Sequence, residues 1–172
     1  HGATVQPIMT KEATKVITPL AISWGSGSEV ISDWDSSMSQ LGTYDAIVVA
    51  PATRNSIAKH LNGIMDSPVM MALSAARGNG TPLIFVPSMH SDLFDDPVTG
   101  DLLDSLEQEG SHIIVDEESE GKRKQSDPNE IVSRLCHIVN SSLPKRKKIA
   151  LTLGANSCLL YTSPSPRDGD DS

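Results

Sequence analysis

The sequence predicts one α/β domain, an open, doubly wound, mostly parallel sheet between two layers of helices. Two apolar runs rich in β-branched residues, Ile47–Ala50 and Leu83–Val86, have the length and composition of strands buried on both faces. Each run is followed by a polar turn and then by apolar residues at helical spacing, as in folds of this kind. We expect about five or six parallel strands, with Ile47–Ala50 as a central one.

The turn after the first of these runs is a candidate binding site. Asn55 or Ser56 can cap the helix that follows, and Gly63 can end it. Ligands of open α/β sheets bind beyond the carboxyl ends of the strands, where a helix N-terminus offers unpaired N–H groups to an anion. The spacing therefore allows a phosphorylated cofactor at residues 51–56, although most strand-to-helix turns bind nothing.

Composition excludes several classes of protein. The 172 residues are 38% hydrophobic, which is enough for one compact core, and the net charge of −8 argues against nucleic acid and anionic membrane surfaces as partners. No apolar run approaches the ~20 residues that span a bilayer, and no signal-peptide pattern precedes the domain. Cys136 and Cys158 form neither a disulfide framework nor a metal-type CxxC pair. We expect a cytoplasmic protein.

Caps and short apolar runs predict the N-terminal elements. Strands are expected over Thr4–Met9 and Glu29–Ser32. Between them, Thr10 can cap a first helix, and Thr18 can cap a second helix that ends near Gly25.

The same signals predict the elements after the first unit. Pro68 starts a helix that Gly78 can stop, and Asp96 starts one that Gly110 closes. The other expected elements are strands over Thr81–Pro87 and His112–Val115, an exposed polar loop from Asp116, a last helix starting at Asp127 and Pro128, and a solvated acidic face formed by Asp101, Asp104, Glu107 and Glu109.

Two segments resemble a known family letter by letter. PATRNSIAKHLNGI, residues 51–64, is similar to the PATANTIAKxxxGI segment of flavin-dependent decarboxylases that act on peptidyl-cysteine-like substrates, especially the phosphopantothenoylcysteine decarboxylases of coenzyme A synthesis. PLIFVPSMHSDLFDDP, residues 82–97, resembles that family's strand ending in Pro, any residue, Met, Asn, with His for Asn in archaeal-type members. The matches occur in order, and a weaker resemblance extends from His1 to about Leu153.

The resemblance implies a flavodoxin-like or Rossmann-like fold and FMN as the cofactor. It implies decarboxylation of 4′-phospho-N-pantothenoylcysteine to 4′-phosphopantetheine. In the family, FMN oxidises the substrate thiol to a thioaldehyde, which acts as the electron sink for the loss of carbon dioxide, and the reduced flavin then returns its electrons. Relatives assemble as trimers with the site between subunits, so a homotrimer or a multiple of trimers is implied here.

The resemblance also assigns site residues. Asn55 is shared between flavin and substrate, and His90, just beyond the end of a strand, orients the carboxylate that is lost, so these are the expected catalytic residues. Arg54 departs from the family's usual small residue and could add an anion contact. The implied cofactor-binding residues are Thr10, Val16, Thr53, Arg54, Asn55 and Ser56, and the implied substrate-binding residues are Met89, His90 and Lys122.

Simpler interpretations of some of these residues stay open. Without the resemblance, Thr10 is a helix cap, Val16 is a packing residue and Lys122 belongs to a solvated charge cluster. Asp92 and its acidic neighbours beside His90 allow a metal site, but one histidine and three acids in a Pro-bounded turn lack a specific metal-binding spacing. We expect no metal.

One residue that the family needs is missing. Relatives have a histidine a few residues before the central strand as the base that helps oxidise the thiol, whereas this sequence has Ser36–Met38 there and no histidine between His1 and His60. Neither a hydroxyl nor a thioether can take up a proton near neutral pH as imidazole does. Either His60 or His90 substitutes, or the chain is a non-catalytic FMN-binding regulatory subunit. A flavin prenyltransferase has another signature, and a ligand-free α/β domain is the third alternative.

The resemblance divides the chain into four parts. Residues 1–140 are a decarboxylase-like domain that lacks its first βα unit, and residues 141–148 are a linker. Residues 149–157 resemble the start of the ligase domain of bifunctional coenzyme A enzymes. In residues 158–172, CLLYTSPSPRD resembles the translation of a transposon-end sequencing adapter, so we exclude this stretch from the fold and expect a gene fragment.

Overall fold

The computed structural model describes residues 2–34, 44–115, 122–123 and 126–141. The chain forms two compact units, residues 1–125 and 126–172, and each is described by itself. The predictions for Ser36–Met38, for the linker and for residues 149–172 lie outside the described residues. Within the described residues, none of the helices is both long enough and apolar enough to cross a bilayer.

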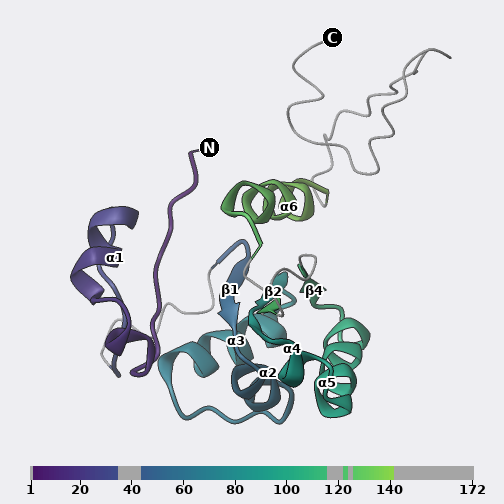
Figure 1. Cartoon of the computed structure of the whole chain (residues 1–172). Coiled ribbons are helices and arrows are strands. Elements are labelled where there is room, and N and C mark those ends of the chain that lie inside the picture. The colour runs from purple at the N-terminus through teal and green to yellow at the C-terminus, as the bar shows by residue number, and fades with distance from the viewer. Residues whose placement is uncertain (1, 35–43, 116–121, 124–125, 142–172) are drawn as a thin grey trace, which may run out of the picture. The chain divides into compact units, whose positions relative to one another are not determined.

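Three parallel strands form the sheet of the first unit (Figure 1). They are β1 (Ile47–Ala52), β2 (Leu83–Pro87) and β4 (His112–Ile113), in the order β1-β2-β4. The expected parallel α/β fold is therefore confirmed, but β2 and not β1 is the middle strand of the described sheet. All five residues of β2 are buried, whereas Ala50 and Pro51 of β1 are exposed. The described sheet has three strands rather than five or six.

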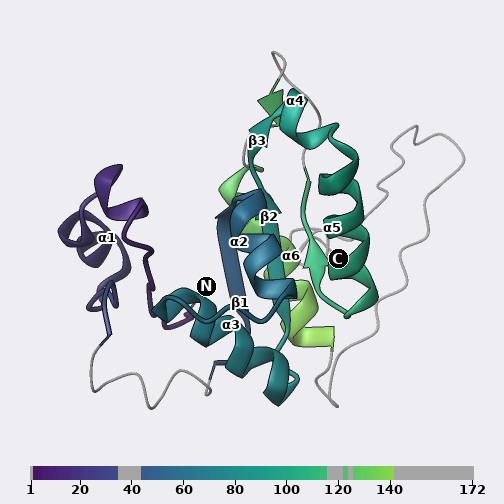
Figure 2. The ribbon, with the colours of Figure 1, turned by 90° about the horizontal axis from the view of Figure 1, so that it is seen from below.

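Three helices cover one face of this sheet, as Figure 2 shows: α2 (Arg54–Leu61), α3 (Pro68–Asn79) and α5 (Pro97–Gln108). Alternate residues of the strands, such as Val49 and Phe85, pack against them. The helical side of this core is formed by Ile57 of α2, Met70, Leu73 and Ala76 of α3, and Leu106 of α5. Because these strands and helices share one core, the core fixes the strand before each turn and the helix after it.

Polar caps and glycines set the helix ends, in part at other residues than expected. Thr53, rather than Asn55 or Ser56, caps α2. Gly80, whose φ of 70° suits a residue without Cβ, ends α3 in place of Gly78. Asp96 caps α5 as predicted, and its carboxylate accepts a hydrogen bond from the Val98 amide.

A short antiparallel ladder lies beyond β2. It pairs β3 (Met89–His90) with β5 (Lys122–Arg123), and a single helical turn, α4 (Ser91–Phe94), follows β3. Figure 2 shows β3 and α4 together at one end of the sheet. The loop predicted from Asp116 thus contains a strand, because β5 pairs with backbone that the sequence pattern does not reveal.

The N-terminal segment is less regular than predicted. A parallel bridge between Ile8 and Ile31 replaces the two expected strands. Thr10 accepts a hydrogen bond from the Ala13 amide, but the helix it opens is a single 3₁₀ turn, η1 (Ala13–Lys15). Helix α1 (Pro19–Ser26) begins at its Thr18 cap as predicted and ends at Gly27.

The second unit contains α6 (Pro128–Ser141). Its start agrees with the predicted Asp127–Pro128 signal, since the Asp127 carboxylate accepts a hydrogen bond from the Asn129 amide 2.7 Å away. An Arg134–Glu130 ion pair bridges one turn on its exposed side.

Candidate functional site

The two segments singled out in the sequence leave the sheet side by side. Ala52, the last residue of β1, is paired in register with Pro87 of β2, and the Ser88 amide donates to the Ala52 carbonyl over 3.3 Å. The register shifts between Val49 and Ala52, an irregularity that turns the end of β1. The turns that follow therefore meet at the carboxyl edge of the sheet, where open α/β folds bind their ligands.

The α2 turn supplies one half of this site. The Thr53 hydroxyl accepts from the Ser56 amide over 3.2 Å and lies 2.9 Å from the Ser56 hydroxyl. Thr53 and Asn55 are both exposed. The amides of Arg54 and Asn55 precede the first backbone bond of the helix, so this turn has donors that a phosphate group needs.

Arg54 does not face solvent as a free cation. Its Nη1 lies 2.5 Å from Oδ2 of Asp96, the cap of α5, and the two side chains are 34% and 35% exposed. The hydrogen bond from the Val98 amide first, and then the one from the Arg54 guanidinium, hold the pKa of the Asp96 carboxyl below its ordinary value. The Arg54 guanidinium is thus already paired with a carboxylate of the same chain, that of Asp96.

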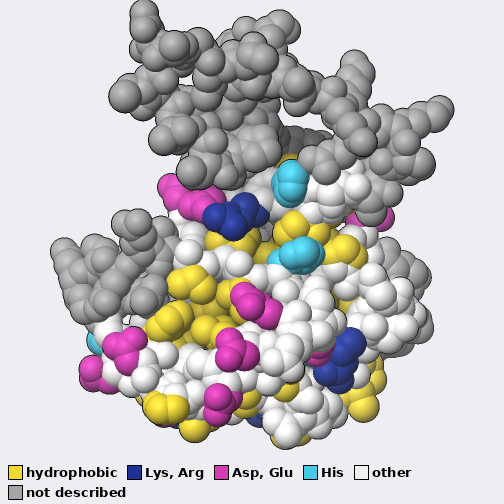
Figure 3. All heavy atoms as spheres, turned by 90° about the vertical axis from the view of Figure 1, so that its right-hand side faces the viewer, with side chains coloured by type: hydrophobic (Ala, Val, Ile, Leu, Met, Phe, Trp, Pro, Cys, Tyr) yellow, Lys and Arg dark blue, Asp and Glu magenta, His cyan; other side chains and the backbone are white. Residues whose placement is uncertain are grey.

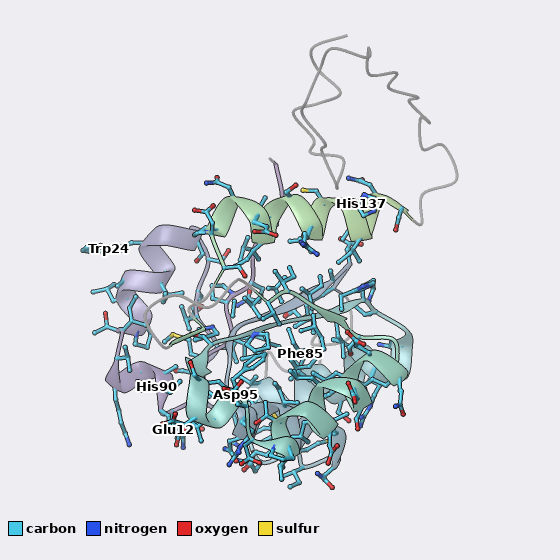
Figure 4. All side chains as sticks on the ribbon, turned by 45° about the vertical axis from the view of Figure 1, so that its right-hand side comes forward. Glu12, Trp24, Phe85, His90, Asp95 and His137 are labelled. Carbon is cyan, nitrogen blue, oxygen red and sulfur yellow. The ribbon has the colours of Figure 1, made fainter. Side chains whose placement is uncertain are left out.

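The turn after β2 supplies the other half. His90 is exposed, and Figure 4 shows it at the surface, in contrast to Phe85 inside the domain. In the β3–β5 ladder, Lys122 is the register partner of His90, and Arg123 is the partner of Met89. The register therefore places the backbones of Lys122 and His90 at neighbouring positions. The backbones of the three predicted substrate-binding residues thus lie in one short ladder, with Met89 on the opposite face of its strand from His90.

Two predicted cofactor residues belong to the N-terminal segment. Thr10 acts there as a cap, and Val16 is 89% exposed. The contacts that the structure gives for Thr10 are local, so the role of this pair toward a flavin stays a prediction. Among the described residues, no group of three His, Cys, Asp or Glu side chains is arranged to hold a metal ion.

His60 cannot replace the missing base at this edge. It lies in the last turn of α2, its side chain is 1% exposed, and its ring is tilted against Phe85 with centroids 5.3 Å apart. Its Nε2 lies 2.7 Å from Oε1 of Glu109, and because a carboxylate only accepts, that nitrogen carries the proton. The suggestion that His60 substitutes is thus wrong: it is a buried structural residue at the opposite edge of the sheet.

Glu109 is the centre of this second cluster. Besides His60, it accepts hydrogen bonds from Ser111 over 2.7 Å and from Arg77 over 3.4 Å. Burial acts to raise the pKa of the Glu109 carboxyl, but its donors, Ser111 first and then His60, outweigh burial and lower that pKa. The predicted solvated acidic face of α5 is therefore correct for Asp101, Asp104 and Glu107, which are exposed, but wrong for the Glu109 side chain. Figure 3 shows acidic side chains spread over this side of the molecule.

Sequence reasoning missed the part that Asp96 plays at the site. It identified the residue as a helix start, which is correct, but not as the partner of Arg54, 42 residues away. The signal in the sequence was the arginine in place of a small residue, since a cation at a helix N-terminus needs a compensating charge.

The Flavoprotein family matches residues 1–140. The coenzyme A biosynthesis bifunctional protein CoaBC of Thermococcus kodakarensis is 31% identical over 162 residues, covering 90% of this chain and 40% of that protein. The protein of the same name from Methanocaldococcus jannaschii is 30% identical over 161 residues, covering 91% and 39%. This chain thus spans about 40% of the length of these curated relatives.

Solved structures share the fold. The FMN-binding protein AtHal3 superimposes with a TM-score of 0.69 at 21% identity, covering 82% of this chain and 84% of the other. The FMN-dependent cysteine decarboxylase SpaF gives 0.68 at 22% identity, covering 78% of each chain. A PPC decarboxylase mutant complexed with pantothenoylaminoethenethiol gives 0.63 at 22% identity, covering 79% and 83%. With its first 140 residues matched and this fold in common, the chain belongs to the Flavoprotein family.

Proposed function

We propose that this protein binds FMN at the carboxyl edge of β1 and β2 and decarboxylates 4′-phospho-N-pantothenoylcysteine to 4′-phosphopantetheine. The observation that carries the proposal is the pairing of Ala52 with Pro87, which brings residues 53–56 and 88–90 together. These are the segments with the strongest resemblance to the decarboxylases. The CoaBC relatives, named for coenzyme A biosynthesis, support the choice of reaction.

The residues of the α2 turn fit a flavin phosphate. Thr53 and Asn55 are exposed, and the first-turn amides, including that of Arg54, offer donors at the positive end of the helix dipole. Thr53, Asn55 and Ser56 would hold the cofactor, with Thr10 and Val16 contributing from the N-terminal segment. When bound, FMN accepts electrons from the substrate thiol and returns them after carbon dioxide has left. Asn55 would also orient the substrate beside it.

The ladder side of the site fits an anionic substrate. A ring N–H of His90 can donate a hydrogen bond to the substrate carboxylate. Met89 would add an apolar contact, and Lys122, on the neighbouring strand β5, would bind the substrate phosphate. Because two anionic groups must be held at once, a basic residue in this ladder fits this substrate better than an uncharged one.

An FMN-binding regulatory subunit is the second candidate. The observation that favours it is the buried position of His60, one of the two histidines considered as a replacement for the family's base. Such a subunit would bind FMN and leave the substrate intact.

One experiment separates the two functions. The purified protein is titrated with FMN, and binding is followed by flavin fluorescence. It is then incubated with 4′-phospho-N-pantothenoylcysteine, and the mass of the product is measured by mass spectrometry. We expect saturable FMN binding and a product lighter by one carbon dioxide. FMN binding without product would favour the regulatory subunit. A folded protein that does not bind FMN would contradict both functions.

The substrate assignment has its own matched pair of variants. Lys122→Met should raise KM about tenfold by removing a contact to the phosphate, whereas Arg123→Met, opposite Met89, should change it little. A substrate lacking the phosphate should lose this difference. Equal effects of both variants on the phosphorylated substrate would contradict the role of Lys122.

Assembly and location are part of the same proposal. A homotrimer is supported by large apolar side chains at the N-terminal helices that are exposed in the single chain: Val16 at 89%, Leu20 at 59% and Trp24 at 79%. Light scattering of the purified protein measures this, and a monomer at micromolar concentration would contradict it. A cytoplasmic location accompanies a role in coenzyme A synthesis.

The residues after the family domain fit the proposed division of the chain. The Thermococcus alignment covers 90% of 172 residues, about 155, which is at least 15 more than the 140 residues of the family match. The similarity to that bifunctional protein therefore extends into residues 141–172. This supports residues 141–148 as a linker and residues 149–157 as the start of a ligase-like unit.

A further inference from the structure

Arg54 and Asp96 connect the two halves of the candidate site. Arg54 is the first residue of α2, between Thr53 and Asn55. Asp96 is the last residue before α5 and follows the turn that carries His90. One carboxylate oxygen of Asp96 accepts from the Val98 amide over 3.0 Å, and the other lies 2.5 Å from the Arg54 guanidinium. The pair thus joins the N-termini of two helices that both begin at the carboxyl edge.

Several contacts hold the segment between β2 and Asp96, besides its ladder with β5. Its first amide, that of Ser88, reaches the end of β1, and in its middle the buried Thr99 hydroxyl donates to the Leu93 carbonyl over 2.5 Å. At its far end, Asp96 is tied to α2 through Arg54. This contact is the side-chain link between the end of the segment and the first turn of α2, and it adds to the backbone bond from Ser88 to Ala52, just before that turn.

Stability alone does not account for the pair. Both side chains are about a third exposed, and exposed ion pairs add little to folding. The α2–α5 contact already has an apolar interior in which Ile57 and Leu106 are fully buried. The contribution of the pair is therefore local, at the turns that hold the expected site residues.

We propose that Arg54 and Asp96 are positioning residues, which fix the substrate half of the site (residues 88–95) relative to the cofactor half (residues 53–56). This inference rests on the proposed function and deepens it. Arg54 acts through Asp96, rather than by touching the cofactor or the substrate with its guanidinium. Orientation matters because a displacement of the order of 1 Å between reacting groups can cost about 100-fold in rate.

The chain offers a matched control at the other end of α2. Lys59 and Asp66 form an ion pair of the same length, 2.5 Å, with side chains 31% and 47% exposed. Lys59→Met therefore removes a comparable surface ion pair from the same helix but away from the site. Arg54→Met and Asp96→Ser break the candidate pair, and serine retains a cap for α5.

The first measurement is amide hydrogen exchange in the FMN-loaded protein. In Arg54→Met and Asp96→Ser, exchange across residues 88–95 should be roughly tenfold faster, as expected when a local restraint is removed. Lys59→Met should leave it unchanged, and Arg54→Lys should restore most of the protection. Unchanged exchange across residues 88–95 in Arg54→Met would overturn the proposal.

The second measurement is steady-state kinetics with FMN saturating. Both variants should lower kcat/KM about tenfold to 100-fold, and the double variant should be no worse than either one, because the two residues act as a unit. Additive losses, or equal losses in Lys59→Met, would overturn the positioning role. If the unaltered protein shows no turnover, the proposed reaction fails, while hydrogen exchange still decides whether the pair couples the two turns.

Discussion

The two edges of the sheet carry similar polar residues in opposite states. At the amino edge, His60, Ser111 and Arg77 donate to one carboxylate, that of Glu109, and the histidine is buried. At the carboxyl edge, Asn55 and His90 are exposed. Polar groups that satisfy one another hold helices together, whereas exposed groups beside a helix N-terminus remain available to a ligand.

One hollow in the surface belongs to the amino edge. A pocket of about 220 Å³ lies at the amino edge and is lined by the starts of β2 and β4 and by Arg77, Glu109 and Ser111. Those three side chains are bonded to one another. Because its polar side chains already pair within the chain, this hollow is a weaker candidate for a ligand site than the carboxyl edge, where open α/β folds bind ligands.

Removing a site side chain should affect turnover most. His90→Ala is expected to lower kcat/KM at least about 100-fold, close to 3 kcal/mol, because the substrate carboxylate loses its donor. Its effect on unfolding should be within about 0.5 kcal/mol, since His90 is exposed. Steady-state kinetics and urea unfolding measure the two effects. A large loss of stability would show that the carboxyl edge is as structural as the amino edge.

Removing the Glu109 carboxylate, the centre of the amino-edge cluster, should lower stability and leave cofactor binding unchanged. Glu109→Ala leaves buried His60 and Ser111 without their acceptor, so it should lower the free energy of unfolding by about 2 kcal/mol. FMN affinity should remain unchanged. Glu107→Ala, an exposed acid on the same helix, is the control and should be near neutral. Weaker FMN binding in Glu109→Ala, at temperatures where it stays folded, would contradict the division between the edges.

Removing the cap of α2 should affect both stability and FMN binding, each by a smaller amount. Thr53→Ala removes the acceptor for the Ser56 amide, so it should cost about 1 kcal/mol of stability. FMN should also bind several-fold more weakly, because the turn that holds it frays. Thr53→Ser should restore both. If thermal unfolding changes but the FMN dissociation constant does not, the turn caps a helix without serving a cofactor.

The smallest expected effect is on the free energy of unfolding at acidic pH. The pKa of Glu109 in the folded chain lies below its ordinary value of 4.5, so its contribution to stability is fully present above that value and is lost as the pH falls through the folded-state pKa. The stability difference between the unaltered protein and Glu109→Gln should therefore shrink on acidification. Urea unfolding from neutral pH to about pH 3 measures it. A difference that stays constant or grows would contradict the ionised state of Glu109.

Local signals predicted helix starts better than contacts between distant residues. The starts of α1, α3 and α5 follow from a polar cap followed by proline, because such caps are set by neighbouring residues. The central position of β2 does not follow, because strand order depends on pairing between distant segments. The Arg54–Asp96 and His60–Glu109 contacts join residues 42 and 49 positions apart, which no spacing rule reaches.

The most direct test of the account is a titration of the ¹⁵N-labelled protein with FMN, followed through its backbone amide resonances. The account predicts that the largest shifts fall on Thr53 to Ser56 and Ser88 to His90, at the carboxyl edge. Amides of Gly80 and Ser111, at the amino edge, should move little. Shifts confined to the amino edge, or no shift at all in the folded protein, would contradict it.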